Sequence, residues 1–342
     1  MKKNIEIVRY KSLDETQKKW WDEFLYQAHC ESKFNNSIAG SEFHREIFGY
    51  EPTYFEIKIN NEIKAIFIGY KNYRGKRFIL RTKLPKFIKK IINSILNFLL
   101  SYLVVLSPIA FKKDTLDLEV DDIYLCLLGG KSKVIDKCII YNIRNIKNLT
   151  KIKIKKWCSY IIDTSLNHEE IFRNFSKSTQ KEIRRSIKNG VIVERLSTEK
   201  SIAEWVNWIN NPIVKKESNK DLYVNYEFFL NFFKSVSNKN HYTVEVFASK
   251  LNDKIIGSLM ILGYGDLVTE YWVYNDPIAK AEKIYTHELI KYEVCKYCNT
   301  NQISYFDLAG YNPNPLRNDK ESGIFNFKSK FGGYPIEYIL IR

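Results

Sequence analysis

The sequence lacks a pattern of histidines that would bind a metal ion. Its five histidines are His29, His44, His168, His241 and His287. They show no ligand spacing, and the run HELIK at 287–291 departs from the zinc motif HExxH because Lys291 replaces the second histidine. The sequence therefore predicts no metal site.

The motifs of several common enzyme classes are also absent. The chain has no GxSxG nucleophile motif, no Walker A loop and no Rossmann glycine pattern. Of the six cysteines, only Cys295 and Cys298 form a CxxC, and one such pair inside a helical pattern is a weak zinc or redox signal. We expect the cysteines to be reduced and mostly structural.

The N-terminal run MKKNIEIVRYKSLDE lacks the apolar core of a signal peptide, which predicts a cytoplasmic protein. Residues 91–111 carry no charge and are about as long as a membrane span, but polar residues interrupt them and Pro108 stands near their end. We expect a short buried helix followed by a buried strand. Because Lys86, Lys89 and Lys90 come just before, a face that rests on the inner surface of the membrane is a second hypothesis.

Positive charge and apolar residues are what the chain has in excess. Lys and Arg number 54 against 39 Asp and Glu, which gives a net charge of +15, and 45% of the 342 residues are hydrophobic. This is enough for a full core, and the length fits two domains better than one. The charge is typical of proteins that bind RNA, nucleotide phosphates or anionic membranes, but general lysine enrichment explains it equally well.

Two segments of the sequence look alike. Residues 54–70 and 245–264 each contain an extended apolar run, a turn with Asn, a second extended run and Gly-Tyr, and both predict β-hairpins. An aromatic helical pattern precedes each hairpin. We therefore expect a tandem duplication of one unit, with domains at 1–155 and 156–342.

The second half gives the clearer order of elements. In chain order we expect a mostly helical segment at 165–190, a polar loop at 210–221, a helix at 225–236, strands at 242–248, 255–263 and 267–274, a helix at 284–297, a strand at 303–308, a loop at 310–318, a short helix at 321–330 and a strand at 334–341. A meander followed by helix, strand, helix and strand indicates an α+β fold around one mixed sheet.

Three stretches of the second half carry a resemblance to a known family. They are FSKSTQKEIRRSIKNGVIVE (175–194), YFDLAGY (305–311) and GIFNFKSKFGGYPIEY (323–338). In this order they resemble the basic helix, the strand ending in Asp-x-x-Gly and the terminal Phe-Lys-x-x-Phe-Gly-Gly segment of Fem-type (FemABX-like) transferases and their GNAT-like relatives in envelope polysaccharide pathways. The first half resembles them more faintly. The resemblance implies tandem GNAT-like domains, each a mixed sheet flanked by helices.

The resemblance also implies an activity. Such proteins transfer an acyl or aminoacyl group to an amine on a cell-envelope precursor, here a peptidoglycan peptide or an amino sugar of a surface polysaccharide, linked to a nucleotide or a lipid. The donor would be aminoacyl-tRNA or an acyl thioester on CoA or a carrier, with no tightly bound cofactor.

One departure bears on the donor. Acetyl-CoA enzymes carry a glycine loop that cradles the pyrophosphate, whereas Asn275–Thr286 contains no glycine. This favours the Fem-type interpretation. The alternatives are an acetyl-CoA-dependent sugar N-acetyltransferase and a non-catalytic module that binds RNA or a membrane through the same fold.

The basic stretch predicts a helix with four cations on one face. Lys177, Lys181, Arg184 and Lys188 recur at i, i+4, i+7 and i+11. They could hold the phosphates of the acceptor or of tRNA, and a solvated surface helix is the alternative.

The bounds of this helix are also suggested by the sequence. Thr179 and Glu182 have the spacing of a capping box, and Gly190 is a good stop. Ile183 and Ile187 are expected to lie on another face of the helix.

Lys328 stands between phenylalanines near the chain end. The resemblance implies a functional lysine close to the reacting carbonyl or to the donor's terminal ribose and phosphate, with Phe327 beside the acceptor. At the carbonyl, its ammonium would stabilise an oxyanion. Gly332 and Gly333 would let the chain turn tightly below it. The alternative is a lysine whose stem covers the core and whose head lies in water.

Asp307 and Glu270 are weaker candidates for the catalytic site. Attack by an amine on a carbonyl requires a proton acceptor, and a carboxylate can serve unless the donor supplies its own. The alternatives are a turn-forming role for Asp307 before Gly310 and a solvent-facing strand position for Glu270.

Overall fold

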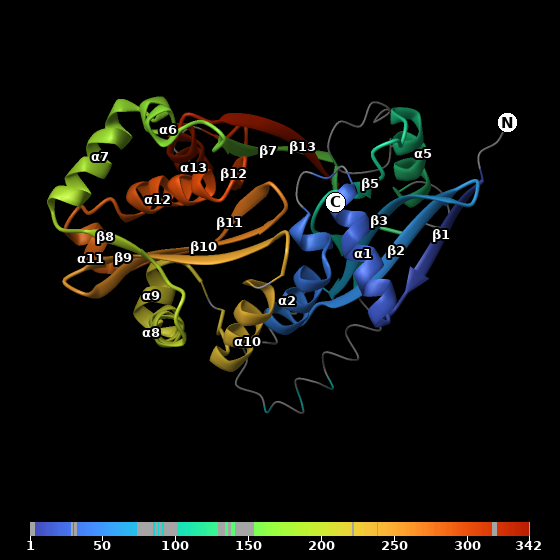
Figure 1. The fold of residues 1–342 in the computed structure, drawn as a ribbon, viewed down its shortest axis with the longest axis horizontal. Coiled ribbons are helices and arrows are strands. Elements are labelled where there is room, and N and C mark those ends of the chain that lie inside the picture. Colours follow the sequence, from blue (N-terminus) through green and yellow to red (C-terminus); the bar gives the residue numbers. More distant parts are fainter. Residues whose placement is uncertain are drawn as a thin grey trace. The chain divides into compact units, whose positions relative to one another are not determined.

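The computed structural model (Figure 1) describes residues 4–28, 30, 33–73, 85, 88, 91, 101–128, 134–135, 138–140, 154–220, 222–237, 239–316 and 320–341. The chain divides into two compact units, residues 1–156 with 338–342, and residues 157–337. The sequence-based division gave all residues after 155 to the second domain, whereas the last residues of the chain lie in the first unit.

The first unit is built on an antiparallel sheet. The strand order is β1 (Ile5–Tyr10), β2 (Glu51–Ile59), β3 (Glu62–Tyr73) and β4 (Ser101–Val105), with β5 (Ala110–Phe111) also on β3. Every strand pair described here is antiparallel, including β6 (Cys138–Ile140) with residues 339–341 at the end of β13 (Tyr334–Ile341). The mixed sheet expected for each domain is therefore described only in the second unit.

Helices cover both faces of this first sheet. On one face α1 (Glu15–Gln27) and α2 (Ile38–Phe48) pack on β2, where the Trp21 and Tyr54 rings lie 5.4 Å apart. The short 3-10 helix η1 (Phe34–Asn36) precedes α2. On the other face α5 (Asp117–Leu128) shares a core with β2 and β3.

The second unit is built on a mixed sheet. Its strand order is β6, β13, β7 (Ile154–Asp163), β12 (Tyr305–Tyr311), β11 (Leu267–Asn275), β10 (Lys254–Tyr264), β9 (Tyr242–Leu251) and β8 (Ile192–Arg195). β11 and β12 run parallel, whereas β12–β7, β11–β10, β10–β9 and β9–β8 are antiparallel.

Helices lie on both sides of this second sheet (Figure 1). One side carries α6 (His168–Asn174), α7 (Lys177–Lys188), α12 (Thr286–Thr300) and α13 (Lys320–Ser329). The other carries α8 (Glu199–Asn210), α9 (Pro212–Glu217) and α10 (Tyr226–Ser237), and α11 (Pro277–Ala281) joins β11 to α12. Trp205 of α8 packs on Trp272 and Phe229, which identifies an aromatic core on the second side.

Both predicted hairpins are present, because the turn residues favour them. In the first unit Asn60 and Asn61 have φ of 51° and 67°, and in the second Asn252 and Asp253 have φ of 48° and 62°. Two consecutive residues with positive φ form a hairpin turn whose twist matches that of the strands. Asn and Asp tolerate this conformation better than most residues do.

Two local predictions were wrong. The segment 210–221, expected to be a loop, contains α9, which begins at Pro212. Asn211 caps this helix, because its side chain accepts a hydrogen bond from the Ile213 N–H. The cap of α7 is Ser176, whose hydroxyl accepts from the Thr179 N–H, so Thr179 and Glu182 do not form the capping box.

The predicted end of α7 matches the structure. Gly190 has φ of 80°, its N–H bonds to the Ile187 carbonyl, and the Val191 N–H bonds to the Ser186 carbonyl. These two bonds form a Schellman motif, which requires the left-handed conformation that glycine adopts easily. Ile183 is buried, but Ile187 is 54% exposed and belongs to the surface.

The uncharged segment at 91–111 is described only in part. Its end forms β4 and β5. Residues 92–100 and the lysines at 86, 89 and 90 lie outside the described residues, so the predicted helix and membrane-facing surface stay predictions. Within the described part of the chain, no helix has the length and apolar character needed to cross a membrane.

The turn after α13 is closely packed against the rest of the unit. A Cβ atom on Gly332 would lie 2.2 Å from the Asn174 carbonyl oxygen, and one on Gly333 would lie 2.1 Å from that of Ile161. Gly332 also has φ of 67°. The expectation that these glycines allow a tight turn therefore agrees with the contacts.

Replacing Gly333 by alanine should lower the free energy of unfolding by about 2 kcal/mol, because overpacking against main-chain atoms forces the strands to shift. The control is Gly323→Ala in α13, where a Cβ atom meets nothing within 4 Å. Alanine there should raise the free energy of unfolding by about 1 kcal/mol through helix propensity. Urea unfolding measures both, and equal effects at the two positions would contradict the close packing.

Candidate functional site

The parallel pairing of β11 with β12 is short. Leu267, Val268 and Thr269 pair with Tyr305, Phe306 and Asp307. β11 continues to Asn275 with no further β12 partner in its described register, and β12 has an irregularity between Asp307 and Gly310. We call this region, Thr269–Trp272 of β11 and Asp307–Gly310 of β12, the fork.

A bulge in β11 changes which side chains face each way at the fork. Glu270 pairs with Ile261 and Trp272 with Met260, so Tyr271 is the extra residue. One extra residue reverses the alternation of side chains along a strand. Glu270 therefore faces α12, whereas Trp272 faces the aromatic core on the opposite side.

A buried ion pair joins β11 to α12 at the fork. Lys291 is 1% exposed, and its Nζ lies 2.5 Å from Oε2 of Glu270. The same Nζ lies 5.3 Å from the Phe327 ring centroid and 5.9 Å from that of Phe331. The two aromatic faces add a cation–π attraction to the ion pair.

Sequence reasoning missed Lys291, which was noted only because it disqualifies HELIK as a zinc motif. A signal was available. Lys291 shares a helix face with His287 and Cys295 at i−4 and i+4, and all three are buried. A lysine on the apolar face of a helix is rare unless a partner neutralises it.

Asp307 is buried on the β12 side of the fork. Its Oδ1 accepts hydrogen bonds from the Ser159 hydroxyl and from the Ala309 N–H, both at 2.7 Å. Burial raises the pKa of the Asp307 carboxyl to about 6, although the two hydrogen bonds and Lys328 oppose this change. The side chain forms the predicted turn, because it holds Ala309 at φ of 61°.

Lys328 reaches the same turn from α13. It is 7% exposed, and its ammonium donates to the carbonyls of Leu308, Ala309 and Gly310, the last two at 2.9 and 3.1 Å. These three bonds use all the donors that a lysine has. Burial lowers the pKa of Lys328, and the nearby carboxylates of Glu270 and Asp307 raise it. The head group therefore does not lie in water, unlike the alternative interpretation, and its contact with a ligand stays a prediction.

The structure brings the three predicted catalytic residues together. Asp307, Glu270 and Lys328, with Lys291 added, form what we call the fork cluster, two carboxylates and two ammonium groups at the point where the strands separate. Glu270 is largely buried, so the expectation of a solvent-facing position is wrong. Phe327 is half-buried and packs on Lys291.

The predicted cations of α7 form a separate surface. Lys177, Lys181, Arg184 and Lys188 are exposed, and Arg184 lies over the Phe172 ring at 5.2 Å. No hydrogen bond or ion pair between described residues links these four to the fork cluster. The helix adds Arg185 to the same exposed group.

The connection that would carry a pyrophosphate loop has a different structure. Residues 277–281 form α11, and the Asp276 side chain caps it by accepting from the Ile278 N–H. This connection, which has no glycine, therefore forms a short capped helix in place of a glycine loop.

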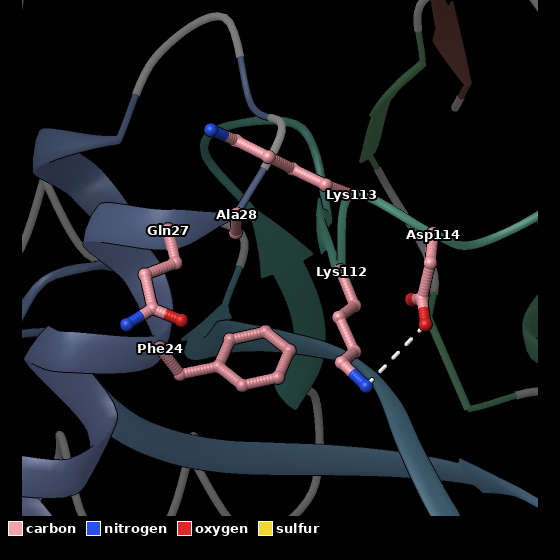
Figure 2. A pocket seen from close by; sticks show the side chains of 6 residues that line it. All are labelled: Phe24, Gln27, Ala28, Lys112, Lys113 and Asp114. Atoms are coloured by element: carbon pink, nitrogen blue, oxygen red, sulfur yellow. Dashed lines mark ion pairs between the residues drawn. The ribbon is translucent and has the colours of Figure 1, made fainter.

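The first unit has a surface hollow of about 310 Å³, which Figure 2 shows. It is lined by Phe24, Gln27, Ala28, Lys112, Lys113 and Asp114. Lys112 at its rim pairs with Asp114 at 3.4 Å and with Glu62 at 2.6 Å. None of the residues predicted from the sequence lines this hollow.

Comparison with known proteins identifies the fold. Neither a family model nor a characterised protein matches the sequence. The structure of FemX is similar, with a TM-score of 0.62 and 12% identity over 97% of this chain and 96% of that one. L-PGS from Bacillus licheniformis has a TM-score of 0.51 and 11% identity over 94% and 90%.

A tandem GNAT protein from the clavulanic acid biosynthesis pathway is also similar, with a TM-score of 0.50 and 5% identity over 99% of this chain and 98% of that one. Together these structures confirm the predicted α+β fold with tandem GNAT-like domains. They also confirm the resemblance to Fem-type proteins at the level of fold.

Removing one partner of the Glu270–Lys291 pair should destabilise the folded protein. Glu270→Gln or Lys291→Met should each lower the free energy of unfolding by about 3 kcal/mol, because each leaves a buried charge uncompensated. The double variant should lose about 2 kcal/mol less than the sum, since both charges are then absent. Urea unfolding of the four proteins measures this coupling, and purely additive losses would contradict a buried ion pair.

The raised pKa of Asp307 predicts a pH dependence of stability. The folded pKa of about 6 lies above the ordinary 3.8, so the folded protein binds the proton more tightly than the unfolded chain does. This contribution is complete below about pH 4 and is lost as the pH rises through about 6.

The reference is Asp307→Asn, which keeps the acceptor oxygen but does not titrate. Relative to this variant, the free energy of unfolding of the wild type should fall by up to about 3 kcal/mol as the pH rises from about 4 to above about 6. Unfolding curves across this range test it. If the free energies of unfolding of the two proteins changed with pH in the same way, a raised pKa of Asp307 would be excluded.

Proposed function

We propose that the protein is an acyl or aminoacyl transferase. Its acceptor is an amino group on a cell-envelope precursor, either a peptidoglycan peptide or an amino sugar of a surface polysaccharide. The observation that carries this proposal is the fork cluster, which gathers buried ionisable groups where two strands of a GNAT-like fold separate. Ionisable groups that are buried and have shifted pKa values tend to gather at functional sites.

The fork supplies a place for the donor carbonyl. Past Thr269, β11 and β12 no longer pair in the described register. Main-chain N–H groups at the point where the two strands separate would stabilise the oxyanion that forms when an amine attacks an ester or thioester. Because β11 is held on one edge by β10, these donors need little reorganisation during the reaction.

Asp307 is the proposed proton acceptor. The amine nitrogen forms a bond to the donor carbonyl carbon and releases a proton, which the Asp307 carboxylate accepts. The bond from that carbon to the ester oxygen or thioester sulfur breaks, and the proton passes to the departing oxygen or sulfur. A carboxyl with a pKa near 6 is suited to this exchange at neutral pH.

The other cluster residues act through Asp307 and the strands. Lys328 positions the turn of β12 that carries Asp307, because it holds three successive carbonyls. Its charge also favours an anion at the fork. Glu270 is paired with Lys291 and so is less available as a base.

The donor is aminoacyl-tRNA or an acyl thioester on CoA or a carrier. The capped helix α11 stands where acetyl-CoA enzymes have their glycine loop, which supports a donor other than acetyl-CoA. The cations of α7 would hold phosphate groups that accompany the substrates. The proposed location is the cytoplasm, where both kinds of donor are made.

The test is transfer to a soluble acceptor. Purified protein is supplied with aminoacyl-tRNA, acyl-CoA or acetyl-CoA and with UDP-linked muramyl peptide or UDP-amino sugars, and mass spectrometry detects a new amide. With the active pair, kcat/KM should rise with pH through about 6 as Asp307 ionises. Asp307→Asn should lower it about 100-fold and remove this dependence.

The control is Asp163→Asn, which changes a half-buried carboxylate at the end of β7. It should leave the rate and the pH profile as in the wild type. Equal rates for wild type and Asp307→Asn would exclude Asp307 as the base. Transfer from acetyl-CoA alone to a UDP-amino sugar would identify a sugar N-acetyltransferase instead.

A further inference from the structure

We propose that the exposed face of α7 docks the protein onto an anionic lipid surface, with Ile187 inserted among the lipids. This docking face consists of Lys177, Lys181, Arg184, Arg185, Lys188 and Ile187. It lies in the second unit.

The docking face is the outward side of a helix whose inner side is fixed. Thr179, Gln180, Ile183 and Ser186 are buried, and Ile183 belongs to the core that α7 shares with α12. In Figure 1, α7 lies at the periphery of the second unit. A large flat partner could therefore reach this face without disturbing the core.

The charge of the docking face has a single sign. All five cations are exposed, and no carboxylate among the described residues forms an ion pair with any of them. The one acidic residue of the helix, Glu182, is turned inward, where its Oε2 lies 3.9 Å from Nζ of Lys330. Arg184 and Arg185 lie over the rings of Phe172 and Tyr285, which leaves their charge uncompensated. Five cations with no carboxylate partner among the described residues match the negative potential of an anionic membrane.

Ile187 places an apolar side chain at the edge of these cations. It is 54% exposed, and it follows Arg184 by three residues, so the two side chains are neighbours on the helix surface. A second isoleucine, Ile192 on the edge strand β8, is 50% exposed just after the Gly190 turn. Single exposed isoleucines are common on protein surfaces. Here two of them, one in α7 and one in the strand that follows it, stand close together in the sequence at the basic end of the helix.

This combination favours lipid over nucleic acid. Phosphates attract the cations in either partner, but an isoleucine gains nothing from a phosphate backbone, whereas burial among acyl chains stabilises it. Single-stranded RNA is bound largely by stacking on aromatic side chains, and α7 carries none. If the proposed function is correct, docking would also bring the enzyme close to acceptors that are linked to a lipid.

The experiment is co-sedimentation of the full chain with vesicles. We expect the wild type to bind vesicles of equal parts phosphatidylglycerol and phosphatidylcholine, and not phosphatidylcholine alone. Since each cation near such a surface contributes a factor of about five, Arg184→Gln with Lys188→Gln should weaken binding about 25-fold. Ile187→Ser should weaken it about fivefold with every charge retained.

Matched controls come from the same unit. Lys200→Gln with Lys254→Gln removes two exposed lysines elsewhere, and Ile213→Ser removes an isoleucine that is 63% exposed on α9. Neither control should change vesicle binding. Because all these side chains are exposed, the melting temperatures should stay close to that of the wild type.

Three outcomes would overturn the proposal: no binding to phosphatidylglycerol vesicles, binding that survives the loss of Arg184 and Lys188, or binding unaffected by Ile187→Ser. Salt-sensitive binding to a tRNA mixture without vesicle binding would assign α7 to nucleic acid instead. The co-sedimentation experiment contains no donor or acceptor, and the transfer assay uses soluble acceptors without vesicles. The docking proposal and the proposed activity can therefore fail independently.

Discussion

The bonds from the Lys328 ammonium to three successive carbonyls of β12 are the interaction on which the site depends. Where β12 becomes irregular after Asp307, its carbonyls need donors other than a neighbouring strand. Lys328 supplies three of them from one group, and the Ala309 N–H then points back to Asp307. The Asp-x-x-Gly and Phe-Lys-x-x-Phe-Gly-Gly segments are thus two halves of one structure, and the close-packed Gly332-Gly333 turn fixes the second half in place.

The electrostatics of the fork follow from this arrangement. Two carboxylates and two ammonium groups lie in a largely dry region, where each charge is tolerated only because the others compensate it. Lys291 is committed to Glu270, and Lys328 to the carbonyls of β12. Asp307 is left as the group whose proton affinity is raised towards neutral pH. A site that must exchange a proton with an amine benefits from one carboxyl that differs in this way from its neighbours.

The sequence predicts those features that depend on local chemistry. The Asn-containing turns at 60–61 and 252–253 identify the hairpins, and Gly190 identifies the end of α7. The resemblance in the second half leads to Asp307 and Lys328. The partners of these residues could not be predicted, because the bulge at Tyr271 depends on the register with β10. Lys291 is stable inside the protein only because that bulge turns Glu270 towards it, and a single sequence does not show this pairing.

The central claim, that the donor carbonyl binds at the fork, is tested most directly by hydrogen exchange of the backbone amides. The protein would be compared with and without a non-transferable analogue of the donor that supports transfer. The account predicts slower exchange in peptides that cover β11 from Thr269 onward and β12 around Asp307, with no change in the β9–β10 turn. Protection confined to other segments, such as Lys112–Asp114 at the hollow of the first unit, would contradict it.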